Sequence, residues 1–289
     1  MNRRFLLLLL SCLMAPLFVC AQTAVKYSLD RHDDGHYYFH APMYGQDVEI
    51  MLESGIPALL VGQDFYEKRM KKSGLKFEKS NAKMRLMNNV YQIIYQSEGR
   101  ISLGKTVFDG PIFVLDGFNG ISMPLQFLKT SANGKHVVML NLPELYFEVG
   151  GTLKRDGTKF KLNYEKNTHR PFINANFTID GITFDGKLLV DMGCPMFLFL
   201  FRQHRSVNNA IVRRQIELKS GYNAQGQRVS MGFNAKTVKF YGAEYKNLII
   251  GVTGQYRNET ELGFLGTPYF DAPVYFDFDD GWMYKVKLR

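Results

Sequence analysis

Apolar and polar residues alternate along most of the chain from residue 36 onwards, in short segments that end at Gly, Asn or Asp. A two-residue period interrupted by turn-forming residues is typical of short β-strands. The pattern predicts hairpins at residues 38–49, 137–149, 172–186 and 274–286, the last closed by an Asp-Gly turn. Residues 63–72 and 207–218 are candidates for helices. The sequence therefore predicts an all-β fold with a few short helices.

The chain also resembles itself at an offset of 138 residues. Residues 51–57 (MLESGIP) match residues 189–195 (LVDMGCP), and both follow a predicted hairpin and precede an apolar strand. Further elements recur in the same order, namely 101–104 with 239–242 and 121–128 with 263–270. Repetition of whole elements in one order indicates two related halves.

These halves define the predicted domain organisation. We assign the first lobe to residues 36–151 and the second to residues 169–289, joined by a linker at residues 152–168 that is rich in Lys, Asp and Gly. In a fold of two related lobes, the cleft between them is the expected place for a binding site.

The repeated loop carries an acid two positions before a glycine, Glu53 before Gly55 in the first copy and Asp191 before Gly193 in the second. Gly allows a sharp turn and the close approach of a partner loop. If the two loops meet at a two-fold axis, the carboxyl groups share one proton, because like charges so close cannot both ionise. The ionised group can then take a proton from a water molecule while the neutral group polarises a carbonyl.

This loop resembles the active-site motif of the aspartic proteases of the retropepsin and pepsin type, in a two-lobed single-chain form that covers about residues 36–289. The second lobe carries the motif at residues 189–193 (LVDMG) and the later element of the family at residues 262–267 (LGFLGT). The resemblance implies two related β-barrel-like lobes and a peptide or protein substrate in the interlobe cleft. It implies catalytic roles for Asp191 and Glu53. The residues that it assigns to loop geometry, substrate binding or a flap over the cleft are Ser54, Gly55, Gly193, Gly266 and Tyr91.

The first lobe departs from the family pattern in two places, and the second in one. Glu53 stands where the family has Asp, and residues 121–124 (ISMP) end without the Gly of the later element. Met192 replaces the hydroxyl residue that hydrogen-bonds across to the other loop. Two hypotheses therefore remain open. The chain is either a peptidase with an unequal Glu–Asp pair, or an inactive relative that binds an extended peptide or another ligand in the interlobe cleft by strand addition.

The N-terminus has the pattern of an export signal. Arg3 and Arg4 precede an almost unbroken apolar run at residues 5–19, which is shorter than the roughly 20 residues of a membrane-spanning helix. Small residues favour cleavage after Ala21, and lipidation of Cys20 is the less favoured alternative. We expect residues 1–21 to be a cleaved signal peptide. The mature protein would then lie in the periplasm, at the cell surface or outside the cell.

Composition narrows the class of protein further. A content of 46% hydrophobic residues is enough for a folded core and excludes an intrinsically disordered chain. The net charge of +9 becomes +7 once the two arginines of the signal are removed. The basic residues are scattered, so we expect no nucleic-acid partner and only weak association with anionic surfaces. After the signal, we expect no transmembrane segment.

The remaining candidate residues predict no further chemistry. Cys194 is the single cysteine after the signal, so no intramolecular disulfide can form, and we expect a buried thiol rather than a nucleophile. We assign residues 22–35 to a short N-terminal extension. His32, His36 and His40 lie in a strand-like segment just after the predicted cleavage site, and side chains four apart on a strand are distant. We therefore expect no metal site. No nucleotide or zinc-enzyme motif is present, and we expect no cofactor.

Overall fold

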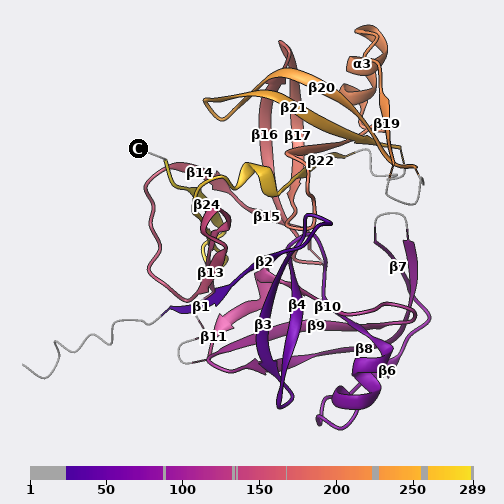
Figure 1. Cartoon of the computed structure of the whole chain (residues 1–289), viewed down its shortest axis with the longest axis vertical. Coiled ribbons are helices and arrows are strands. Elements are labelled where there is room, and N and C mark those ends of the chain that lie inside the picture. The colour runs from indigo at the N-terminus through magenta and orange to yellow at the C-terminus, as the bar shows by residue number, and fades with distance from the viewer. Residues whose placement is uncertain are drawn as a thin grey trace, which may run out of the picture.

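The computed structural model describes residues 24–86, 89–131, 134, 136–166, 168–222, 228–254 and 260–287. The predicted signal peptide lies outside these residues. Three sheets make up nearly the whole structure, one in each half of the molecule and one between them (Figure 1).

The first sheet is built from residues 30–130. Eight of its strands follow the order β2 (Asp30–Arg31), β3 (Tyr37–Met43), β4 (Gln46–Glu53), β10 (Ile121–Pro124), β5 (Leu59–Gly62), β9 (Thr106–Leu115), β8 (Asn89–Leu103) and β6 (Glu78–Lys79). Two more strands pair at its side, β11 (Leu128–Thr130) with β9 and β7 (Lys83–Leu86) with β8.

The second sheet is built from residues 163–265. Its order is β15 (Asn163–Tyr164), β16 (Pro171–Ile179), β17 (Ile182–Val190), β22 (Glu261–Leu265), β18 (Leu198–Phe201), β21 (Ala243–Thr253), β20 (Arg228–Phe240) and β19 (Lys219–Tyr222). The eight strands of the second sheet match, in order, the eight-strand path of the first, including a parallel pair of β4 with β10 and of β17 with β22. This common topology confirms the prediction of two related β-lobes.

The third sheet is shared between the two lobes. Its order is β1 (Val25–Ser28), β13 (Tyr146–Val149), β12 (Val137–Asn141), β23 (Val274–Asp277), β24 (Trp282–Lys285) and β14 (Thr158–Lys161). β12 pairs with β23, so the closing hairpin of the first half is hydrogen-bonded to that of the second. The segment assigned as a linker thus contributes a strand, β14, to this sheet and another, β15, to the edge of the second sheet.

The helices are short. They are α2 (Gln63–Phe65) with the continuing π-helix Tyr66–Met70, the 3-10 turns Leu125–Phe127, Leu142–Glu144 and Thr267–Tyr269, and α3 (Arg205–Arg213). The first helical candidate is confirmed, but the second ends five residues early. Gln215 has a φ of +51°, a left-handed conformation that a helix cannot continue through. Ile216 and Leu218 then pack against the core as irregular chain.

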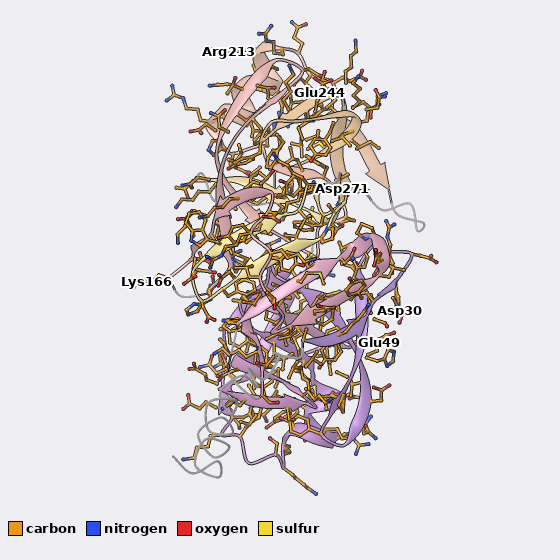
Figure 2. The ribbon with its side chains drawn as sticks, turned by 90° about the vertical axis from the view of Figure 1, so that its left-hand side faces the viewer. Asp30, Glu49, Lys166, Arg213, Glu244 and Asp271 are labelled. Atoms are coloured by element: carbon orange, nitrogen blue, oxygen red, sulfur yellow. The ribbon has the colours of Figure 1, made fainter. Side chains whose placement is uncertain are left out.

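The predicted hairpins are confirmed by the pairing of β3 with β4, β12 with β13, β16 with β17, and β23 with β24. Gly281 in the last turn has a φ of +69°, as the Asp-Gly signal requires. The main hydrophobic core extends through both halves of the molecule and contains fully buried rings such as Phe39, Phe147 and Phe240. Side chains fill the interior along the whole length between Glu49 and Glu244 (Figure 2). No helix within the described residues is long and apolar enough to span a membrane.

Candidate functional site

The two acids of the repeated loops lie at equivalent positions of the two sheets. Glu53 is the last residue of β4 and is opposite Pro124 of the parallel neighbour β10. Asp191 directly follows β17, and its backbone N–H donates to the carbonyl oxygen of Leu265 in the parallel neighbour β22 at 3.0 Å. Each acid is therefore held at the end of an inner strand that is hydrogen-bonded on both sides.

The two loops face each other across the centre of the molecule. A Cβ atom at Gly55 would collide with the carboxylate of Asp191, and a Cβ atom at Gly193 would collide with the carboxylate of Glu53. Each carboxyl group thus lies against the glycine of the opposite loop. The structure brings together four of the residues that the sequence singled out, and only glycine leaves room for this arrangement.

A hydroxyl group connects the two loops from one side. The Ser54 Oγ donates to the carbonyl oxygen of Val190 at 2.7 Å and accepts from the backbone N–H of Met192 at 2.9 Å. Ser54 is completely buried. Met192 has no hydroxyl group with which to make the reciprocal pair of bonds, so of these two residues only Ser54 bridges the loops through a side-chain hydroxyl.

Burial shapes the protonation of both acids. Glu53 is only 6% exposed, and this burial raises its pKa well above the usual range of a glutamate, with a further increase from the negative charge of Asp191. Burial also raises the pKa of Asp191, to about 6, although the Gly193 N–H and the charges of His36 and Arg170 oppose the change. The Gly193 N–H donates to Asp191 Oδ1 at 2.9 Å. Both carboxyl groups therefore hold their protons to higher pH than isolated acids do, and the charge of Asp191 disfavours the ionisation of Glu53.

The acids lie at a cavity of about 550 Å³ whose walls come from both lobes. Its lining is mainly apolar and includes Ile56, Leu60, Phe118, Leu189, Phe199 and Phe264. Tyr91, which the sequence placed in a flap, lies on the hairpin of β7 and β8 and lines this cavity. Its ring packs edge-on against Phe118, with 5.6 Å between the ring centroids.

Gly266 directly follows β22 and lies against the second acidic loop. A Cβ atom there would collide with the carbonyl oxygens of Cys194 and Met196, so this position requires glycine. The equivalent position of the first lobe is Pro124, and the turn after it is tied to the loop by a side chain instead, because Gln126 Nε2 donates to the Ile56 carbonyl oxygen at 3.0 Å. The two halves thus hold their acidic loops by different contacts.

Two basic residues beside the acids were not among the predicted site residues. His36 and Arg170 both line the cavity. His36 Nε2 lies 3.1 Å from the carbonyl oxygen of Gly193, and Arg170 is held by Glu165. From the sequence, His36 was a candidate for metal binding alone. One sequence signal could have identified both residues. His36 and Arg170 each lie directly before the first long strand of their lobes.

From the sequence, we expect neither a nucleophilic role for Cys194 nor a metal site at the histidines. The described part of the chain bears on both expectations. Cys194 is buried, and burial raises the pKa of its thiol far above the usual range, which leaves it unreactive. Within the described ranges, no three His, Cys, Asp or Glu side chains gather as metal ligands would. His32 and His40 instead lie near Glu49, at 3.5 and 3.9 Å from its Oε1.

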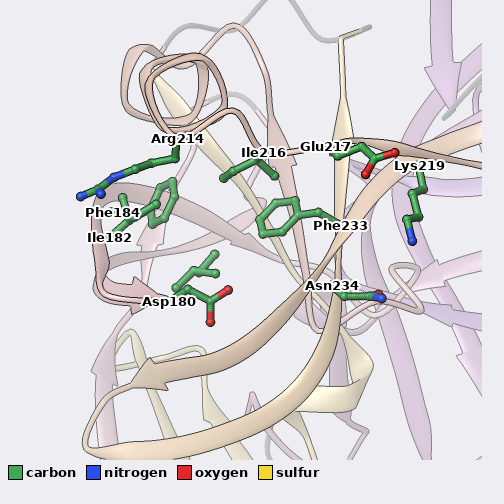
Figure 3. A pocket seen from close by; sticks show the side chains of 10 residues that line it. Asp180, Ile182, Phe184, Arg214, Ile216, Glu217, Lys219, Phe233 and Asn234 are labelled. Carbon is green, nitrogen blue, oxygen red and sulfur yellow. The ribbon is translucent and has the colours of Figure 1, made fainter.

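A second cavity, of about 390 Å³, lies in the second lobe beside the end of α3 (Figure 3). Its floor is apolar, with Phe184, Ile216 and Phe233, and charged side chains stand at its rim. The carboxylate of Asp180 accepts the backbone N–H groups of Lys236 and Thr237, which makes it part of a turn. The acids that line this cavity are Asp180 and Glu217, and it shares no lining residue with the interlobe cavity.

Comparison with known proteins supports the fold. The sequence matches no family model and no curated protein. The structure is similar to the crystal structure of an aspartic proteinase from Irpex lacteus, with a TM-score of 0.58 over 92% of this chain and 98% of that chain. The two sequences are 11% identical over this match. At that identity the likeness shows the fold alone, and it confirms the predicted two-lobed, all-β, pepsin-like architecture.

Proposed function

We propose that this chain is an exported peptidase of the aspartic type, in which Glu53 and Asp191 activate a water molecule to hydrolyse a peptide bond. The observation that carries the proposal is the reciprocal contact of the two acidic loops, in which each carboxyl group lies against the glycine of the opposite loop at the wall of an apolar cavity. The similarity of fold to an aspartic proteinase supports it.

Because two carboxylates so close repel each other, one acid is ionised while the other keeps its proton, and the proposal assigns the ionised role to Asp191 and the protonated role to Glu53. Asp191, as the ionised group, takes a proton from the water while the water oxygen bonds to the carbonyl carbon of the substrate. Glu53, as the protonated group, donates its proton to the carbonyl oxygen. In the second step the proton on Asp191 moves to the amide nitrogen, the C–N bond breaks, and Glu53 regains a proton from the intermediate. Protons balance over the two steps, and no cofactor is needed.

A second candidate function is peptide binding without cleavage. Two observations favour it, the extra methylene group of Glu53 and the absence of a hydroxyl group at Met192. A displacement of about 1 Å at reacting atoms can cost roughly a hundredfold in rate. The apolar cavity and the flap hairpin would serve binding equally well.

Peptide cleavage by variants separates the two functions. Cleavage of a library of apolar peptides is followed from acidic to neutral pH, and we expect Asp191→Asn and Glu53→Gln each to lower kcat at least about a hundredfold. Glu244→Gln, an exposed acid near the far end of the second lobe (Figure 2), is the control. Undiminished cleavage by Asp191→Asn would overturn the catalytic assignment. Peptide binding without cleavage by the wild type, with cleavage gained in Glu53→Asp, would establish the second function.

The proposed export of the protein can be tested separately. Expression of the full chain in a host that processes such signals should yield a mature protein that begins at Gln22. Recovery of the protein in the cytoplasm with residues 1–21 intact would contradict the proposal. A mature protein that begins at a lipid-modified Cys20 would show anchoring in place of release.

A further inference from the structure

The two lobes differ in the charge of their equivalent helices. In the first lobe, the helical segment that follows β5 pairs its lysines with acids one turn earlier. Lys68 Nζ lies 3.2 Å from Asp64 Oδ2, and Lys71 Nζ lies 2.8 Å from Glu67 Oε2. In the second lobe, α3 follows β18 and contains no acid. The positive charges of this helix are therefore balanced in the first lobe and unbalanced in the second.

Cations gather at the two ends of α3. Residues 202–219 hold five cations and a single acid, Glu217, which leaves this segment with a net charge of +4. The five cations are Arg202, Arg205, Arg213, Arg214 and Lys219. All five residues are exposed, and none of them forms an ion pair with another residue that the structure describes. Their charges are therefore available to an anionic partner.

An apolar side chain lies among these cations. Val212 on α3 is 61% exposed and directly precedes Arg213. Arg205 and Val212 are seven residues apart, which places them on the same side of the helix. The opposite side carries the buried residues Val207, Ala210 and Ile211. The outer side of α3 thus presents cations and exposed apolar surface together.

The cavity of about 390 Å³ adds further apolar surface at the end of α3. Phe184 and Phe233 line its apolar floor, and Arg214 and Lys219 lie at its rim (Figure 3). The carboxylate of Asp180, which also lines the cavity, already accepts two backbone N–H groups, at 2.8 and 3.3 Å. A site with cations above an apolar floor suits a molecule that has an anionic head and an apolar chain.

We propose that α3 and the adjoining cavity form a docking surface for a lipid layer with anionic headgroups. Arg205 and Arg213 contact headgroup phosphates, which the planar guanidinium can bind through two hydrogen bonds. Val212 enters the boundary with the acyl chains, and the cavity holds the end of one chain. A soluble anionic polymer could contact the arginines but has no apolar group for Val212 or for the cavity floor. The lipid layer is therefore the partner that fits the whole surface.

The position of α3 leaves the interlobe site free. α3 lies at the end of the second lobe that is farthest from the first lobe (Figure 1), and Arg213 lies at the tip of the molecule (Figure 2). The cavity beside α3 shares no lining residue with the interlobe cavity. A chain docked through α3 thus keeps the interlobe cavity open to a peptide. The inference goes beyond the proposed peptidase activity and does not rest on it.

Vesicle co-sedimentation tests the proposal. The chain is used from Gln22 onward, so that the apolar run at residues 5–19 does not itself bind lipid. Partition onto vesicles of phosphatidylglycerol and phosphatidylcholine is compared with partition onto phosphatidylcholine alone, at about 0.1 M salt. We expect Arg205→Gln/Arg213→Gln to lower partition onto the anionic vesicles about 25-fold, because each basic residue near such a surface contributes about fivefold.

The equivalent helix of the first lobe provides the matched control. Lys68→Gln/Lys71→Gln changes the net charge by the same amount at two exposed positions, and it should lower partition less than about threefold. Val212→Asn keeps every charge and tests the apolar contact. We expect it to lower partition onto anionic vesicles about threefold or more and to leave binding to soluble dextran sulfate unchanged.

Three results would overturn the proposal. The first is equal partition of the wild type onto anionic and uncharged vesicles. The second is a loss in the arginine double variant no larger than that in the lysine control. The third is wild-type partition by Val212→Asn, together with loss of both vesicle and dextran sulfate binding in the arginine variant, which would assign the surface to soluble anionic polymers. A chain that cleaves no peptide would contradict the peptidase and leave the vesicle result intact.

Discussion

At the scale of single residues, the burial of the two acids that suits them to the proposed chemistry lowers the stability of the folded protein at neutral pH. A folded-state pKa that burial has raised means that the folded chain binds a proton more tightly than the unfolded chain does. Stability therefore falls as pH rises through the interval between the unfolded and folded pKa values. For Asp191 this interval runs from the model-peptide value of 3.8 to about 6. Above that interval the loss of stability has reached its full size, and the charged acid destabilises the folded protein.

Replacing Asp191 with Asn should therefore stabilise the protein at neutral pH. The amide can still accept the Gly193 N–H, but it carries no charge to bury. We expect Asp191→Asn to be more stable than the wild type by about 2 kcal/mol at pH 7. The difference should vanish at pH values below the unfolded pKa of the aspartate, where the wild-type acid is protonated in both states.

Urea denaturation at acidic, intermediate and neutral pH measures this difference. Asp109→Asn, at a half-exposed acid that pairs with Lys129, is the control and should change stability by less than about 1 kcal/mol at every pH. A neutral-pH stability of Asp191→Asn equal to or below that of the wild type would show that the carboxylate is well compensated in the folded state.

At the scale of elements, the hydroxyl group of Ser54 hydrogen-bonds the first acidic loop to the second. Ser54→Ala removes both bonds of the Ser54 Oγ and leaves the Met192 N–H and the Val190 carbonyl oxygen buried without that partner. We expect a loss of about 2–3 kcal/mol of stability, because an unsatisfied buried polar group costs its full desolvation. Thermal or urea unfolding measures the loss.

A surface serine provides the matched comparison for this variant. Ser97 Oγ donates to the carbonyl oxygen of Lys76 at an exposed site, and Ser97→Ala should cost about 0.5 kcal/mol or less, because water replaces the lost bond. Equal effects of the two substitutions would mean that the Ser54 crosslink does not contribute to the association of the lobes. Met192→Thr, which offers a second hydroxyl group to the same loops, should partly offset the loss in a Ser54→Ala background.

Elements set by local patterns were predictable, and elements set by distant partners were not. The alternation of apolar residues and the Asp-Gly turn were enough to place the hairpins, and the repeat placed Glu53 and Asp191 on matching loops. β14 was assigned to a linker, because its partner β24 lies more than a hundred residues away. The early end of α3 depends on the left-handed conformation of Gln215, which its residue type does not require. His36 and Arg170 became recognisable only through strand register.

At the scale of the whole molecule, the shared sheet joins the two lobes into one cooperative unit. β12 and β13 come from the first half, β23 and β24 from the second, and β12 pairs with β23 over four residues. Separating the lobes would expose these strand edges and open the common core. A main core common to both lobes and a shared sheet favour unfolding in one transition.

The position of the single tryptophan allows this cooperativity to be measured. Trp282 lies on β24 of the shared sheet, with Lys159 Nζ 3.6 Å from its ring centroid, so its fluorescence reports on that sheet. Far-UV circular dichroism reports on all strands. We expect both signals to change at the same urea concentration. Ile50→Val in β4 and Ile250→Val in β21 remove one buried methylene from each lobe, and each should shift both signals together by about 1 kcal/mol. A tryptophan signal that follows only one of the two variants would show that the lobes unfold separately.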